Sequence, residues 1–108
     1  MSKKYKYINE IYGRKEWKEL KTKLDRIGIR FPLFEKRDGV FFEIQAVDGI
    51  YTFERFTDED DGNVIATDAK IDIDMERWEK CLYHLSNAEI LFIYSVVGVF
   101  SDELRKEE

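Results

Sequence analysis

The first clear pattern along the chain is that of an amphipathic helix. Apolar residues recur at the three-to-four-residue spacing of one helix face, at Trp17, Leu20, Leu24 and Ile27. The residues between them are mostly long charged side chains, which belong on the solvent side. The spacing predicts a helix from about Arg14 to Ile27, ended by Gly28. Residues 1–13 then form an N-terminal arm.

Three strand patterns follow this helix. The apolar run from Ile29 to Glu35 contains the single proline, which cannot donate to a ladder and indicates an edge or a strand start. Two alternating segments come next, Val40 to Val47 and Ile50 to Phe56. Asp-Gly pairs at 38–39 and 48–49 supply the positive φ of tight hairpins. We therefore predict an antiparallel three-stranded meander.

The next segments predict a fourth, weaker strand and a second helix. Val64 to Ile73 returns to strand alternation after a polar loop. Asp74 is a good N-cap for a helix whose apolar residues keep helical spacing from Met75 to Leu85.

The segment from Glu89 to Phe100 is open to two interpretations. Its density of β-branched and aromatic residues favours a central strand buried on both faces. Ser86 followed by Glu89 is instead the pattern of a capping box that opens a third helix. We favour the strand, and expect residues 101–108 to be a charged tail, either a short helix or frayed.

Together these patterns predict an α+β fold in one domain, residues 1–108. The expected architecture is an antiparallel sheet of four to five strands with two helices packed on one face, in the order α-β-β-β-(β)-α-β. A chain of 108 residues leaves no room for two independent cores, and 44% hydrophobic residues suffice for one.

Composition also indicates the cellular compartment in which the protein is expected. The one cysteine, Cys81, cannot form an internal disulfide, so nothing requires an oxidising compartment. The basic start, residues 1–6, has no apolar stretch after it, and the longest apolar run is about half the ~20 residues that span a bilayer. We expect a cytoplasmic protein without membrane association.

Charge is distributed unevenly along the chain. Residues 1–30 hold ten Lys and Arg against four Asp and Glu, a net of +6, and residues 31–108 hold eight against nineteen, a net of −11. One interpretation is a basic and aromatic face for an acidic or phosphate-bearing partner, formed by Lys15, Lys18, Lys21, Tyr5, Tyr7 and Tyr12. The other is that the basic helix packs beside the acidic sheet and neutralises it. No glycine-rich phosphate loop or helix-turn-helix pattern accompanies the basic residues.

An acidic loop is a second candidate site, made of Asp58, Glu59, Asp60 and Asp61. It is either a solvated hairpin loop or a negative surface for a partner. Alignment of Gly62 with the sixth position of a calcium loop puts Thr57 at the first ligand position and Asp68 at the twelfth, where a bidentate Glu is usual. We expect no metal and no cofactor.

Catalytic patterns are weak throughout the chain. His84 is the single histidine, and Cys81 lies one helix turn before it without a third positioned group. No serine stands in a nucleophile motif. Phe41 and Val47, in contrast, fall on the face of the second strand that alternation predicts to be wet, which indicates an exposed apolar patch unless helices cover that face too.

These patterns predict a small non-enzymatic interaction module. We expect an inhibitor, immunity or accessory protein, of phage or mobile-element type, that binds a partner protein or a second copy of itself. The alternative is a nucleic-acid-associated protein that uses the basic first third. A third hypothesis is a subunit whose site forms between chains.

Overall fold

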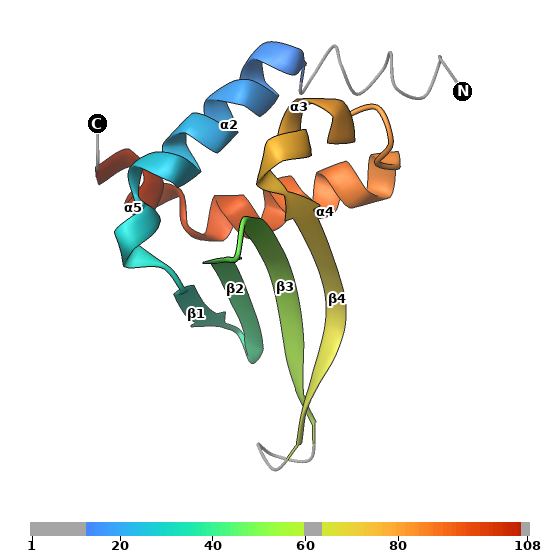
Figure 1. The fold of residues 1–108 in the computed structure, drawn as a ribbon. Coiled ribbons are helices and arrows are strands. Elements are labelled where there is room, and N and C mark those ends of the chain that lie inside the picture. Colours follow the sequence, from blue (N-terminus) through green and yellow to red (C-terminus); the bar gives the residue numbers. More distant parts are fainter. Residues whose placement is uncertain (1–12, 60–63, 107–108) are drawn as a thin grey trace.

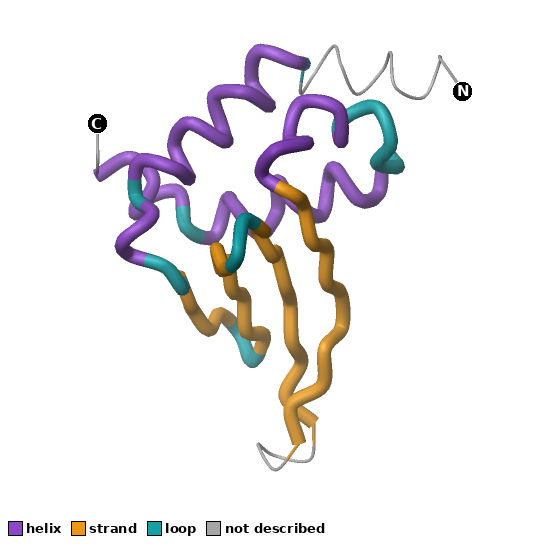
Figure 2. The backbone as a smooth tube through the Cα atoms, viewed as in Figure 1, coloured by secondary structure: helices purple, strands orange, loops and turns teal. Residues whose placement is uncertain are grey.

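The computed structural model describes residues 13–59 and 64–106 (Figure 1). The helices gather at one end of the sheet, and the strands extend beyond them (Figures 1 and 2). The elements run in this order: α2 (Arg14–Arg26), the 3-10 turn η1 (Gly28–Arg30), β1 (Leu33–Arg37), β2 (Val40–Val47), β3 (Ile50–Glu59), β4 (Val64–Asp74), the 3-10 turn η2 (Met75–Arg77), α3 (Trp78–Cys81), α4 (Asn87–Val99) and α5 (Ser101–Lys106).

The four strands form one antiparallel sheet in the spatial order β1-β2-β3-β4. Both predicted hairpin turns are present. Asp38 and Gly39 have φ values of 52° and 80°, and Asp48 and Gly49 have 54° and 76°. Positive φ at both central residues is the geometry of the type I′ turn, one of the two favoured turns of two-residue hairpins. The α+β class, the meander and the fourth strand are thereby confirmed.

Residues 87–99 correct the prediction of a final strand, because they form helix α4. Ser86 Oγ accepts a hydrogen bond from the Glu89 backbone N–H (3.1 Å), and Glu89 Oε1 accepts one from the Ser86 N–H (2.7 Å). This capping box sets the start of the helix. The β-branched and aromatic residues that favoured a strand are explained by burial, since Ile90, Ile93 and Val96 pack into the core.

The second predicted helix is shorter than expected. Asp74 does cap it, because its Oδ1 accepts from the Glu76 N–H (2.9 Å). The chain then forms η2 and the four-residue helix α3, and continues as turns through Leu85 to reach the cap of α4. The tail forms a short helix, α5, whose Leu104 is buried.

The core lies on one face of the sheet. Strand residues with buried side chains all share this face in the register: Leu33, Ile44, Tyr51, Phe53 and Ile73. Helices α2, α3, α4 and α5 supply the remaining buried side chains, together with Ile27, Leu82 and Phe100, which directly follow α2, α3 and α4.

Two tryptophans join α2 to α3 within this core. Trp17 and Trp78 stack with their ring centroids 4.3 Å apart. The Nε1–H of Trp17 donates to the carbonyl of Trp78 (2.5 Å), and that of Trp78 donates to the carbonyl of Trp17 (2.7 Å). Both indoles are buried with their single donor satisfied, so the pair fixes the two helices against each other without a polar cost.

Candidate protein-interaction surface

The second face of the sheet carries no buried side chain in the part of the chain that the structure describes. We call it the open face. Three phenylalanines gather on it, in the half of the sheet near the Asp38-Gly39 turn: Phe34, Phe41 and Phe56. The ring centroid of Phe34 lies 5.5 Å from that of Phe41 and 6.4 Å from that of Phe56. We call these residues the phenylalanine cluster.

Phe34 is the most accessible member, with 56% of its surface exposed. Its ring packs against those of Phe41 and Phe56. The Nζ of Lys36 lies 5.1 Å from the ring centroid of Phe41. The cluster therefore combines an accessible apolar surface with a cation at one edge.

Carboxylates lie beside the phenylalanine cluster. Glu43 on β2 stands opposite Phe34 on one side and opposite Glu54 of β3 on the other. Glu43 accepts a hydrogen bond from Gln45 (2.9 Å), and Glu54 accepts one from Thr67 (2.7 Å). Glu54 in turn stands opposite Lys70 of β4, so a cation on the same row offsets part of the repulsion between the two carboxylates.

The predicted apolar pair lies on the open face. Val47 is 57% exposed, and Phe41 is half-buried by its packing in the cluster. Sequence alternation did not identify Phe34 and Phe56, because they come from other strands. The pairing of Phe41 with Phe56 and of Lys36 with Phe41 is visible only in the register.

The predicted basic face is not one continuous unpaired surface in the structure. Lys18 Nζ lies 3.8 Å from Glu79 Oε2, and Lys21 Nζ lies 2.8 Å from Asp25 Oδ2. Lys15 is exposed. Tyr5, Tyr7 and Tyr12 lie outside the described residues.

Ion pairs also connect the basic first third with the acidic remainder. Besides Lys18 with Glu79, the guanidinium of Arg30 lies 2.8 Å from Glu103 Oε1. The uneven charge of the sequence is thus partly balanced inside the fold.

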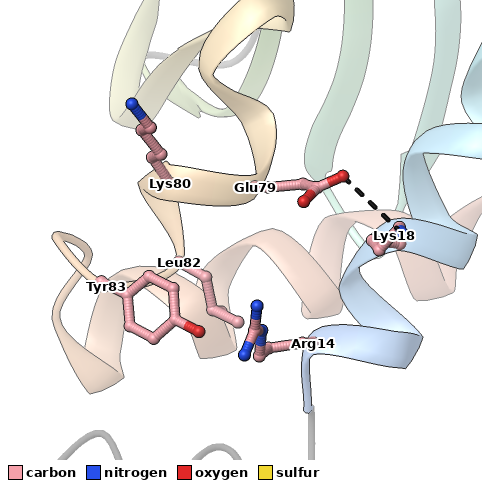
Figure 3. Close-up of a pocket in the computed structure, with 6 residues that line it drawn as sticks. All are labelled: Arg14, Lys18, Glu79, Lys80, Leu82 and Tyr83. Carbon is pink, nitrogen blue, oxygen red and sulfur yellow. Dashed lines mark ion pairs between the residues drawn. The ribbon is translucent and has the colours of Figure 1, made fainter.

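A cavity of about 300 Å³ opens between α2 and α3, where Lys18 and Glu79 meet (Figure 3). Its lining is mainly charged, and the guanidinium of Arg14 lies 5.8 Å from the ring centroid of Tyr83. Figure 3 shows Arg14 and Tyr83 on one side of this cavity and the Lys18–Glu79 pair on another. Leu82 and Tyr83 complete the lining beside the charged residues.

The acidic loop is described only in part. Asp58 and Glu59 belong to the end of β3, whereas Asp60 and Asp61 lie outside the described residues. Within residues 13–59 and 64–106, no group of three or more His, Cys, Asp or Glu side chains is arranged to hold a metal ion.

The two classical catalytic candidates differ in their exposure. His84 is exposed, and Cys81 is half-buried. Burial raises the pKa of the Cys81 thiol, and the nearby carboxylate of Asp74 raises it further, against a lowering by Arg77. A raised pKa disfavours the thiolate, which is the nucleophilic form.

The fold and the open face define a four-stranded α+β domain with a core on one side of its sheet and an accessible aromatic surface on the other. No described helix has the length and apolar character to cross a membrane. Comparisons of the chain with protein-family models, with curated proteins and with solved structures find no match.

Proposed function

We propose that this protein is a non-enzymatic interaction module that binds a partner protein through the open face of its sheet. The observation that carries the proposal is the phenylalanine cluster, with Phe34 56% exposed. Single exposed apolar residues are ordinary on protein surfaces, but contiguous aromatic patches mark interaction sites.

The charges beside the cluster specify the partner's chemistry. Glu43 and Glu54 oppose each other next to Phe34. Because Glu54 also faces Lys70 of β4, Glu43 is the carboxylate that a basic side chain of the partner would contact while its apolar neighbour covers the cluster. The partner is therefore a protein surface with an apolar side chain flanked by Lys or Arg.

The same carboxylates disfavour nucleic acid on the open face, because phosphates would meet Glu43 and Glu54. In the described part of the basic first third, Lys18 and Lys21 are ion-paired within the fold, which reduces the charge available there to phosphates. A protein partner on the open face agrees best with both observations.

The test is a capture experiment on extract of the source cell with matched variants. Wild type is compared with Phe34→Ala on the open face and with Tyr83→Ala, a 42% exposed aromatic residue that lines the cavity between α2 and α3. We expect the specific protein to be retained by wild type and Tyr83→Ala, and retention to fall at least about tenfold with Phe34→Ala, as for a central aromatic contact.

A purified partner then tests the charge argument. Glu43→Lys should weaken binding by about tenfold, because it sets a cation against the partner's basic side chain. If no protein is retained in a Phe34-dependent way, the proposal is wrong. Binding that survives Phe34→Ala but is lost on reversal of Lys15, Lys18 and Lys21 would instead assign the function to the basic face.

A further inference from the structure

The cavity between α2 and α3 carries an excess of positive charge that the proposed partner surface does not use. Its lining contains three cations, Arg14, Lys18 and Lys80, and one carboxylate, Glu79, which gives a net charge of +2. The chain as a whole has a net charge of −5, so this excess of cations is local. A cavity lined mainly by one sign of charge favours a ligand of the opposite sign.

Neighbouring charges on the same two parts of the chain leave this excess unchanged. The segments compared are residues 14–21, the first two turns of α2, and residues 75–86, which run from η2 to the cap of α4. Outside the lining they add three cations and three carboxylates: Lys15, Lys21, Arg77, Glu16, Glu19 and Glu76. These six charges sum to zero, so the net charge of the two segments is again +2.

Arg14 is the cation best placed to hold an anion. Its guanidinium lies over the Tyr83 ring, 5.8 Å from the centroid, and no carboxylate among the described residues forms an ion pair with it. A guanidinium that lies over a ring keeps its N–H donors in its own plane, where they remain available. Figure 3 shows the hydroxyl of Tyr83 pointing toward Arg14. One oxyanion can therefore accept hydrogen bonds from both side chains.

Lys18 supplies a second cation from another side of the cavity. Its Nζ lies 3.8 Å from Glu79 Oε2, and the two side chains are 64% and 66% exposed. A pair of this length and exposure is weak. An ammonium has three donors, so Lys18 can contact an anion while it still neutralises Glu79. The side chain of Lys80 points away from Arg14 in Figure 3, so Lys80 contributes to the potential of the cavity without a contact.

We propose that this cavity binds a phosphate dianion, either free or as the ester of a small molecule, through Arg14, Lys18 and the Tyr83 hydroxyl. A phosphate monoester carries close to two negative charges at neutral pH, which matches the +2 of the lining. Guanidinium groups bind phosphate oxygens through two parallel hydrogen bonds. The volume of about 300 Å³ lies at the lower end of small-molecule sites, so the ligand is small.

The test is a calorimetric titration of the purified chain with phenyl phosphate at about pH 8, where the ester is a dianion. We expect saturable binding with a dissociation constant of about 1 mM or lower, as for a ligand of this size. Phenyl sulfate has the same shape with one negative charge, and should bind at least about fivefold more weakly. Inorganic phosphate identifies the source. Affinity equal to that of phenyl phosphate assigns the site to free phosphate, and lower affinity assigns it to an ester.

Arg14→Gln and Lys15→Gln form a matched pair of variants. Each removes one positive charge from neighbouring exposed positions of α2, but only Arg14 lines the cavity. Arg14→Gln should weaken the binding of phenyl phosphate at least about tenfold, and Lys15→Gln less than about twofold. Tyr83→Phe keeps the ring and removes the hydroxyl, so it should weaken binding about threefold. Thermal unfolding of each variant separates loss of binding from loss of folding.

Three results would overturn the proposal. One is the absence of saturable binding of phenyl phosphate and of inorganic phosphate to wild type. Another is equal weakening by Arg14→Gln and Lys15→Gln, which would indicate a general attraction to the basic helix. The third is equal affinity for phenyl phosphate and phenyl sulfate. Phe34→Ala should bind phenyl phosphate as wild type does, because Phe34 lies on β1 and does not line the cavity. This proposal and the proposed partner binding can therefore fail separately.

Discussion

Phe53 and Phe34 lie on opposite faces of one sheet and have opposite surroundings. Phe53 is fully buried, and its ring lies 6.4 Å from that of Trp78 in the core. Phe34 is 56% exposed, and its ring packs against those of Phe41 and Phe56 on the open face. The same residue type therefore contributes to stability at one position and to accessible surface at the other.

The difference between the two faces also affects the conformational entropy that binding would cost. The strands that carry the phenylalanine cluster are held from behind by Ile44, Phe53 and the helices packed on them. A surface on a rigid sheet loses little conformational entropy when a partner docks. The side chains buried on the core face thus hold the open face in one conformation. Residues of the two faces can be substituted separately.

The largest expected effect comes from the core face. Phe53→Ala removes a fully buried ring and leaves a cavity, so we expect a loss of about 3–5 kcal/mol in the free energy of unfolding. Urea unfolding followed by tryptophan fluorescence measures it, since Trp78 lies next to the site. A loss below about 1 kcal/mol would contradict the division of the sheet into a core face and an open face.

Local signals in the sequence were sufficient for part of this fold. The two Asp-Gly pairs specify hairpin turns by backbone conformation alone, and the apolar spacing of α2 needs no knowledge of its neighbours. The segment 87–99 was different. Its residue types suit a strand, and it is a helix because Ser86 caps it and because the sheet buries Ile90 and Ile93.

The candidate surface could be predicted only within single strands. Alternation placed Phe41 and Val47 on the wet side of β2, but the neighbours that make Phe41 part of a cluster come from β1 and β3. The basic face was difficult to judge for another reason, because the sequence does not show which of its charges are paired within the fold. Lys18 is ion-paired with Glu79, a residue far along the chain, so its charge could not be judged from spacing.

A smaller effect is expected at the end of the core face where Tyr51 meets α2. The Tyr51 hydroxyl donates to the carboxylate of Asp25, and burial with this contact raises the pKa of the phenol well above its usual range. Tyr51→Phe should cost about 1 kcal/mol at neutral pH. That contribution is fully present below the unfolded pKa of about 10 and is lost as pH rises above it, because the unfolded phenol releases its proton first.

Urea unfolding of both proteins at pH 7, 10 and 11 measures this dependence. Above pH 10 the stability of wild type should fall more steeply than that of Tyr51→Phe, by at most about 1.4 kcal/mol per pH unit for one proton. The two proteins differ only at residue 51, so the difference between their curves isolates Tyr51. Parallel curves would show that the phenol is not held protonated by the fold.

The smallest effect is expected on the open face, and its size decides how the binding experiment is interpreted. Phe34→Ala removes the stacking with Phe41 but opens no cavity, so we expect a loss of about 0.5 kcal/mol in the free energy of unfolding. The same urea titration as for Phe53→Ala measures it. If the loss instead approaches that of Phe53→Ala, Phe34 is part of the fold's stability, and reduced partner retention by the variant would reflect unfolding. If it stays small, a loss of binding can be attributed to the phenylalanine cluster itself.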